Sequence, residues 1–371
     1  MFKYLVVFAF IVLSAMAPSA SAQTQSGMEN ESDWLVSNDL LQAGGMAMAW
    51  QINMPLKADE DIDRIFVFDD YAYVLTDSNF LFCINTKTGT PRFSLELASK
   101  GLPVCNPTYA ENKLYFIIGN DLKIVDPAVG SIVESQELPA IGRSAYCGIA
   151  KTEEMLYVAG SNNRLTAINP ETYIKSFQAT ADDDSPIYSF VASSDYLVFA
   201  TTPGTVFAID PLSPEKDWEF IGAEGLKAPL VDEDGSVYIS SLDTKVYKLN
   251  ISNGRSEWPI PFEAGSPLQK SVRLGQDVFY QYAGQSGFYA ADKETGKAVW
   301  ELKGGLEVLT EESGSAYIFT APGVLTVMDN NAGEKLYSVN FSDVTDYAVN
   351  TEDKMYIAND DGRFMAIEIV K

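Results

Sequence analysis

Residues 288–300 read Phe288-Tyr-Ala-Ala-Asp292-Lys-Glu-Thr-Gly296-Lys-Ala-Val-Trp300: an apolar run, an aspartate, a glycine four residues later and an aromatic after four more. The pattern recurs along the 371-residue chain at separations of 41, 43, 41, 40, 42, 37 and 39 residues. Its anchors are Asn85, Asp126, Asn169, Asp210, Asn250, Asp292, Asp329 and Glu368. A period near forty residues accommodates four short strands, so the repeat predicts a β-propeller.

Each part of the repeat has a folding role. The positions four and one residue before the anchor are apolar in all eight copies, which predicts a strand buried on both faces, as in a blade between two neighbours. An Asn or Asp side chain can bond backbone two residues on, and glycine adopts positive φ at little cost, so the anchor predicts a tight turn. Tyr173 and Pro214 replace the glycine in two copies. The aromatic is expected to wedge between adjacent blades.

The two ends of the chain complement each other. The last copy reaches Lys371 without its aromatic strand, whereas Met46 to Asn53 carries an aromatic, Trp50, with no repeat before it. We therefore expect one shared blade, closed by the N-terminal strand. The predicted fold is all-β: an eight-bladed β-propeller of four-stranded antiparallel blades.

The segment Lys293 to Trp300, preceded by Phe288 to Asp292, resembles the pyrroloquinoline-quinone-like (PQQ-like) β-propeller repeat family. The resemblance covers about residues 46–371. It implies the propeller fold and allows several activities, since the family includes quinoprotein dehydrogenases and the outer-membrane assembly factor BamB. The dehydrogenases are expected to be longer and to hold calcium and quinone beside adjacent cysteines, whereas Cys83, Cys105 and Cys147 are never adjacent. No quinone or other cofactor is therefore expected.

The N-terminus predicts export. Lys3, an apolar run from Leu5 to Met16 and the small residues Ala20 to Ala22 are typical of a signal peptide. The predicted organisation is a signal peptide over 1–22, a flexible leader over 23–45, with a helical turn near Asp39, and the propeller over 46–371. We expect a periplasmic or secreted protein cleaved near Ala22. No cysteine follows the apolar run, so the lipid anchor of BamB lipoproteins has no attachment site.

Composition limits the chemistry. The chain has 26 Lys and Arg against 51 Asp and Glu, a formal net charge of −25, which disfavours nucleic acid and anionic lipid surfaces. A cationic partner would be favoured, although acidic surfaces also serve solubility. The chain contains no histidine, which excludes Ser-His-Asp triads and histidine-ligated zinc or haem.

Three acidic clusters and a cysteine pair complete the candidates. Asp182 to Asp184, Asp232 to Gly235 and Asn359 to Gly362 could offer oxygen ligands to calcium, but the last two have the sequence of hairpin turns, and no catalytic, cofactor or metal residue is assigned. Cys105 and Cys147 occupy equivalent positions in consecutive copies, so either a disulfide or two free thiols is expected; Cys83 should be unpaired.

Two functions remain open. One is a secreted or periplasmic protein-interaction or assembly scaffold of the BamB kind, a monomer that binds another envelope or extracellular protein without inserting into the membrane. The alternative is an enzyme or small-ligand binder that uses carboxylates around the central channel.

Overall fold

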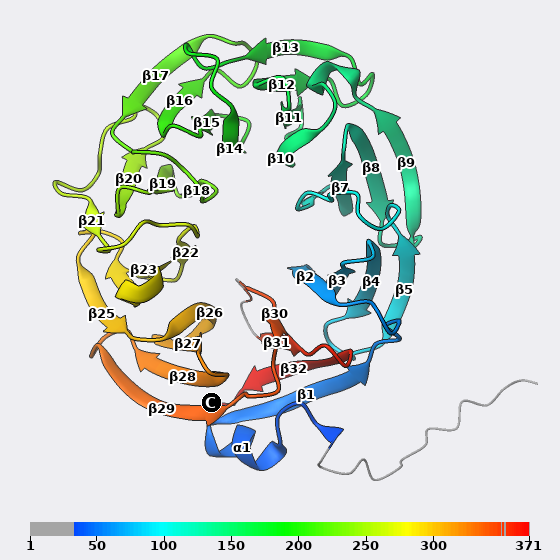
Figure 1. Ribbon diagram of the computed structural model, residues 1–371, viewed down its shortest axis with the longest axis vertical. Helices are drawn as coiled ribbons and strands as arrows, with labels where there is room; N and C mark the ends of the chain where they lie inside the picture. Colours follow the sequence, from blue (N-terminus) through cyan, green and yellow to red (C-terminus); the bar gives the residue numbers. More distant parts are fainter. Residues whose placement is uncertain (1–32, 350, 352–353, 371) are drawn as a thin grey trace, which may run out of the picture.

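Eight four-stranded antiparallel sheets form a closed ring around a central axis in the computed structural model, which describes residues 33–349, 351 and 354–370 (Figure 1). Each sheet is one blade, and in seven of the eight the strands run in sequence order from the axis to the rim. The predicted eight-bladed all-β propeller is confirmed.

Blades 1 to 4 follow one another without interruption. Their strands are β2 (Ile62–Phe68), β3 (Tyr71–Thr76), β4 (Phe80–Asn85) and β5 (Pro91–Glu96); β6 (Thr108–Ala110), β7 (Lys113–Ile118), β8 (Asp121–Asp126) and β9 (Ser131–Glu137); β10 (Ala145–Lys151), β11 (Leu156–Gly160), β12 (Arg164–Ile168) and β13 (Lys175–Ala179); β14 (Ile187–Ala192), β15 (Leu197–Thr201), β16 (Thr205–Ile209) and β17 (Lys216–Ile221). A 3-10 turn, η2 (Pro139–Ile141), joins blades 2 and 3.

Blades 5 to 8 complete the ring. Their strands are β18 (Val231–Glu233), β19 (Ser236–Ser240), β20 (Lys245–Asn250) and β21 (Phe262–Glu263); β22 (Arg273–Leu274), β23 (Val278–Tyr282), β24 (Phe288–Asp292) and β25 (Ala298–Leu302); β26 (Gly305–Glu312), β27 (Ser315–Thr320), β28 (Val324–Asp329) and β29 (Glu334–Asn340); β30 (Asp346–Tyr347), β31 (Lys354–Ala358), β32 (Arg363–Ile369) and β1 (Met46–Asn53). A second 3-10 turn, η3 (Gly284–Ser286), lies within blade 6.

The two ends of the chain share blade 8, as the sequence predicted. Strand β1 pairs antiparallel with β32 from Met46 opposite Ile369 to Asn53 opposite Arg363, and the sheet order is β1-β32-β31-β30. Figure 1 shows β1 lying along β32 at the rim. This pairing closes the ring, because the outer strand of the last blade comes from the beginning of the propeller sequence.

In blades 1 to 7 the repeat anchors lie at the end of the third strand and form the predicted turns. The Oδ1 atom of Asn85 accepts hydrogen bonds from the backbone N–H groups of Lys87 and Thr88, both at 3.0 Å. In the same way, Asp126 Oδ1 accepts a hydrogen bond from the Ala128 N–H at 2.8 Å, and Asp329 Oδ1 accepts one from the Asn331 N–H at 2.7 Å. The side chain therefore replaces backbone partners in the tight turn between the third and fourth strands.

The hydrophobic core is divided among the eight seams between blades. The described buried side chains form eight clusters, and each cluster joins residues of two neighbouring blades. The second and third strands supply most of them, because both faces of these strands are covered by other blades. The apolar spacing in the repeat arises from this burial on both faces.

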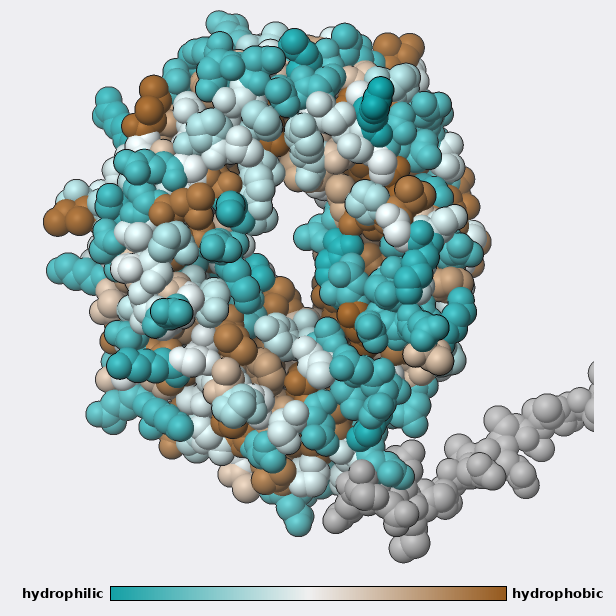
Figure 2. Space-filling model, in the orientation of Figure 1, coloured by the Kyte–Doolittle hydropathy of each residue, from teal (hydrophilic) through white to brown (hydrophobic). Residues whose placement is uncertain are grey.

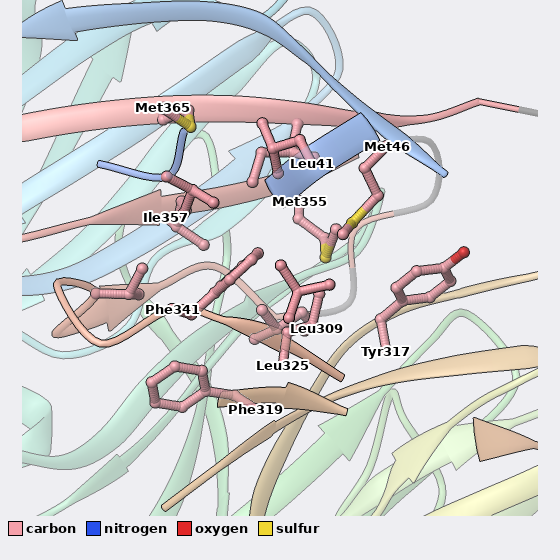
Figure 3. Packing of buried hydrophobic residues seen from close by; sticks show 14 of the residues in the cluster. Leu41, Met46, Leu309, Tyr317, Phe319, Leu325, Phe341, Met355, Ile357 and Met365 are labelled. Atoms are coloured by element: carbon pink, nitrogen blue, oxygen red, sulfur yellow. The ribbon is translucent and has the colours of Figure 1, made fainter. Parts of the chain in front are cut away.

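The leader is packed over its described part, which differs from the mobile segment expected for residues 23–45. Helix α1 (Asn38–Ala43) begins at the predicted helical turn, and Ser37 caps it by accepting a hydrogen bond from Leu40 N–H. Leu35, Val36 and Leu41 are buried in the seam between blades 7 and 8. Figure 3 shows Leu41 and Met46 pointing into this cluster beside Met355. Apolar residues in this short segment thus extend the core; the predicted signal peptide lies outside the described residues.

Candidate functional site

The innermost strands surround a central channel. Figure 2 shows the ring open at its centre, bordered mostly by hydrophilic and intermediate residues. Side chains on these strands bond to the next blade: Ser189 Oγ accepts from Leu230 N at 2.9 Å, Tyr188 Oη donates to the Lys227 carbonyl at 2.9 Å, and Thr108 Oγ1 donates to the Ile149 carbonyl. These polar groups link the blades across the seams.

The charged groups of the inner strands also pair across seams. Arg64 donates to the Val104 carbonyl at 2.7 Å and to Asn106 Oδ1 at 2.5 Å. Arg273 donates to both carboxylate oxygens of Glu307, at 3.2 and 3.3 Å, and the Glu307 side chain is only 6% exposed. A fork of two bonds fixes the relative position of blades 6 and 7. These contacts make the inner ring a rigid support.

The two sets of hairpins differ in charge. Because every blade has the same strand order, the hairpins between first and second strands all lie on one face, which we call the inner-hairpin face. In each of blades 1 to 6 this hairpin carries an exposed carboxylate. The six side chains, in blade order, are Asp69, Glu111, Glu153, Asp195, Asp234 and Asp277. The hairpins between second and third strands lie on the opposite face; those of blades 2, 3, 4, 6 and 7 contain no acidic residue, whereas those of blades 1, 5 and 8 contain Asp77, Asp243, Asp360 and Asp361.

A pocket of about 590 Å³ opens on the inner-hairpin face where blades 5, 6 and 7 meet. Its apolar lining comes from Val231, Leu274, Val308 and Leu309. Its acidic lining comes from Asp232 of β18 and from Glu311 and Glu312 at the end of β26. The pocket therefore combines an apolar floor with carboxylates from two blades.

A hydrogen-bond chain holds one of these carboxylates in place. Tyr280 Oη donates to Glu311 Oε2 at 2.7 Å, and the Gln276 backbone N–H donates to the same oxygen at 3.3 Å. Asn330 Nδ2 donates in turn to Tyr280 Oη at 2.7 Å. Burial, with Glu311 nearby, raises the pKa of Tyr280 far above its usual range, so the phenol stays protonated and donates.

Gly275 is required for this arrangement. A Cβ atom built on Gly275 would overlap Glu311 Oε2. The glycine thus lets the carboxylate of blade 7 lie directly against the hairpin of blade 6. The sequence did not single out Gly275 or Glu311, because the contact joins two blades and neither residue belongs to the repeat pattern.

The three acidic clusters chosen from the sequence do not come together. Asp232 to Gly235 and Asn359 to Gly362 form hairpins within blades 5 and 8, and Asp182 to Asp184 lies in the connection between blades 3 and 4. Among the described residues, no group of three or more Cys, Asp or Glu side chains is arranged to hold a metal ion. Among the residues of these three clusters, Asp232, which the sequence assigned to a hairpin turn, lines the pocket.

The cysteines are three free thiols. Cys147 packs in the seam between blades 3 and 4, whereas Cys105 is close enough to Arg64 of blade 1 for that charge to oppose the upward shift of its pKa. Cys105 also lies close enough to Cys147 to contribute to raising the pKa of that thiol, but no disulfide joins the two. Burial raises the pKa of Cys83 and of Cys147 to about 12.

The fold and the repeat define a propeller of the PQQ-like class. The family described as "Outer membrane protein assembly factor BamB" matches residues 106–302 and 215–343, more than half of the chain, and the protein belongs to this family. No curated protein matches the chain.

Two solved structures have the same fold. BamB from Moraxella catarrhalis is 14% identical, with a TM-score of 0.66 over 87% of this chain and 97% of that one. The computationally designed Ika8 protein is 13% identical, with a TM-score of 0.66 over 85% of this chain and 98% of that one. At these identities the likeness concerns the fold. Within the described part of the chain, no helix has the length and apolar character needed to cross a membrane.

Proposed function

We propose that the protein is a non-enzymatic scaffold of the cell envelope, exported and cleaved near Ala22, that holds another protein on its inner-hairpin face. The observation that carries this proposal is the difference in charge between the two sets of hairpins. If acidity served solubility alone, carboxylates would be expected with similar frequency in both sets. They occur in the first hairpin of each of blades 1 to 6 but in the second hairpin of only three blades, which favours a cationic partner on the inner-hairpin face. Family membership supports an assembly role.

The inner ring suits such a role. Arg64, Arg273 and Glu307 are engaged between blades, so the surface loops sit on a support that resists deformation. A rigid platform binds with little loss of conformational entropy. The exposed hairpins around the channel then present carboxylates at fixed positions.

Site-specific crosslinking tests the proposal with two positions in blade 6. Asp277 lies in an exposed hairpin of the inner-hairpin face, and Gln285 is exposed in η3 on the opposite face. A photoreactive amino acid at Asp277 is expected to capture a discrete protein in the native envelope, and the same group at Gln285 is not. Equal capture at both positions, or capture at neither, would contradict the proposed face.

A further inference from the structure

The pocket between blades 5, 6 and 7 has the chemistry of a site for a long cationic side chain. Its floor is apolar at Val231, Leu274 and Val308, and its wall carries the carboxylates of Asp232, Glu311 and Glu312. Lysine and arginine have apolar stems and charged ends, so they can fill both parts at once. A volume of about 590 Å³ exceeds one side chain and is in the range of sites for small ligands.

We propose that this pocket binds a short basic segment of a partner polypeptide, with an arginine or lysine side chain lying over the apolar floor and its charged end at Glu311. This inference rests on the proposed function and names the chemistry of the partner. It assigns the binding of the partner to one pocket on the inner-hairpin face and to one carboxylate, that of Glu311.

Glu311 is the best-positioned group in the pocket. Tyr280, itself 1% exposed, donates to Oε2, and Gln276 N–H donates to the same oxygen. These bonds orient the carboxylate before any ligand arrives. A carboxylate held in advance costs less to order on binding than one on a free side chain.

Asp232 provides a second acceptor on the opposite blade. It accepts a hydrogen bond from Tyr196 Oη of blade 4, which fixes its orientation across the seam. The neighbouring Glu233 is paired with Lys293, so this lysine is directed to Glu233. Asp232 and Glu311 thus contribute negative charge from two blades to the same pocket.

Titration calorimetry of the full chain with a short amidated peptide of alternating arginine and leucine tests the proposal. Two variants separate charge from position. Glu311→Gln removes the charge but keeps an oxygen that accepts from Tyr280, whereas Gly275→Ala keeps the charge and displaces the carboxylate. Each is expected to weaken peptide binding about tenfold or more, as expected for loss of a charge-assisted hydrogen bond.

Glu334→Gln is the matched control, because Glu334 is exposed on the outer strand β29 and makes the same change of net charge. It should leave peptide binding unchanged, and thermal unfolding should show that all variants are folded. Equal binding by Glu311→Gln and the unsubstituted chain, or no peptide binding at low salt, would overturn the proposal. Spermidine binding as tight as that of the peptide would overturn the polypeptide source and indicate a small-cation site.

The outcomes also separate this inference from the proposed function. Failure of crosslinking at Asp277 would remove the proposed scaffold face. Successful crosslinking at Asp277 together with unchanged peptide binding by Glu311→Gln would contradict the proposal for the pocket and leave the proposed scaffold face in place.

Discussion

The indole ring of Trp50 lies directly over the α-carbon of Gly89, so that a Cβ built on the glycine would be 2.8 Å from Trp50 Cδ2. The indole N–H donates to the carbonyl of Thr86 in the same turn at 2.8 Å. Trp218 repeats this contact on Gly254, and Trp258 repeats it on Gly296. The glycine of the repeat thus has two functions: it adopts positive φ, and it receives the aromatic of the preceding blade.

Gly89→Ala is expected to destabilise the protein more than Gly235→Ala. Both glycines have positive φ, 69° and 79°, which costs alanine about 1–2 kcal/mol. Only Gly89 faces an indole, whose overlap should add about 1–3 kcal/mol; nothing lies within 4 Å of a Cβ at Gly235. Denaturant unfolding of the two variants measures the difference, and equal losses would show that the Trp50 contact does not constrain the turn.

Removal of β1 is expected to destabilise the whole ring. A chain beginning at Leu56 lacks the outer strand of blade 8 and loses Trp50, which is 8% exposed. Loss of a buried tryptophan alone costs about 3–5 kcal/mol. Calorimetry should show a lower unfolding temperature than for a chain beginning at Asp33, which retains β1. An unchanged midpoint would contradict the importance of the shared blade.

Asp346 is expected to make the stability depend on pH. Burial, together with Asp360, Asp61 and Asp63, raises the pKa of its carboxyl in the folded state. The folded state therefore binds this proton more readily than the unfolded chain, so the carboxyl is favourable when protonated at low pH and becomes costly as the pH rises through the folded-state pKa.

Asp346→Asn should accordingly raise the unfolding temperature at neutral pH, and the gain should shrink as the pH falls through the raised folded-state pKa and be absent below about 4, the unperturbed value for aspartate. Asparagine can still accept the hydrogen bond that Thr345 donates. Asp343→Asn, at an exposed position on the same connection, is the control. A gain that persists unchanged in acid would argue against the carboxyl as its source.

All three cysteines are expected to remain free thiols. Cys105 and Cys147 lie close enough to interact, yet both are free thiols in the structure, and a disulfide forms only when the two side chains have the required geometry. Mass spectrometry of alkylated, unreduced peptides decides the question. A Cys105–Cys147 crosslink in the native protein would contradict the prediction.

The repeat by itself determined the architecture. Anchor spacing predicted eight blades, the apolar positions predicted strands such as β4 and β24, and the missing aromatic of the last copy predicted that Met46 to Asn53 closes the ring. These features are local or recur with a fixed period, so one chain displays them many times. Asn85 and its equivalents could be assigned to turns because the hydrogen bonds of such a turn lie within three residues.

Only the tertiary structure decided what lies between blades. The contact of Trp50 with Gly89, the packing of Leu41 on the seam of blades 7 and 8, and the approach of Glu311 to Gly275 join residues far apart or outside the repeat. The pocket draws on Asp232 and Glu311, which are separated by two seams; the sequence assigned Asp232 to a hairpin turn and did not single out Glu311. Short-range patterns specify each blade, but the side chains that meet when blades pack depend on the angle and register of their neighbours, which no single repeat contains.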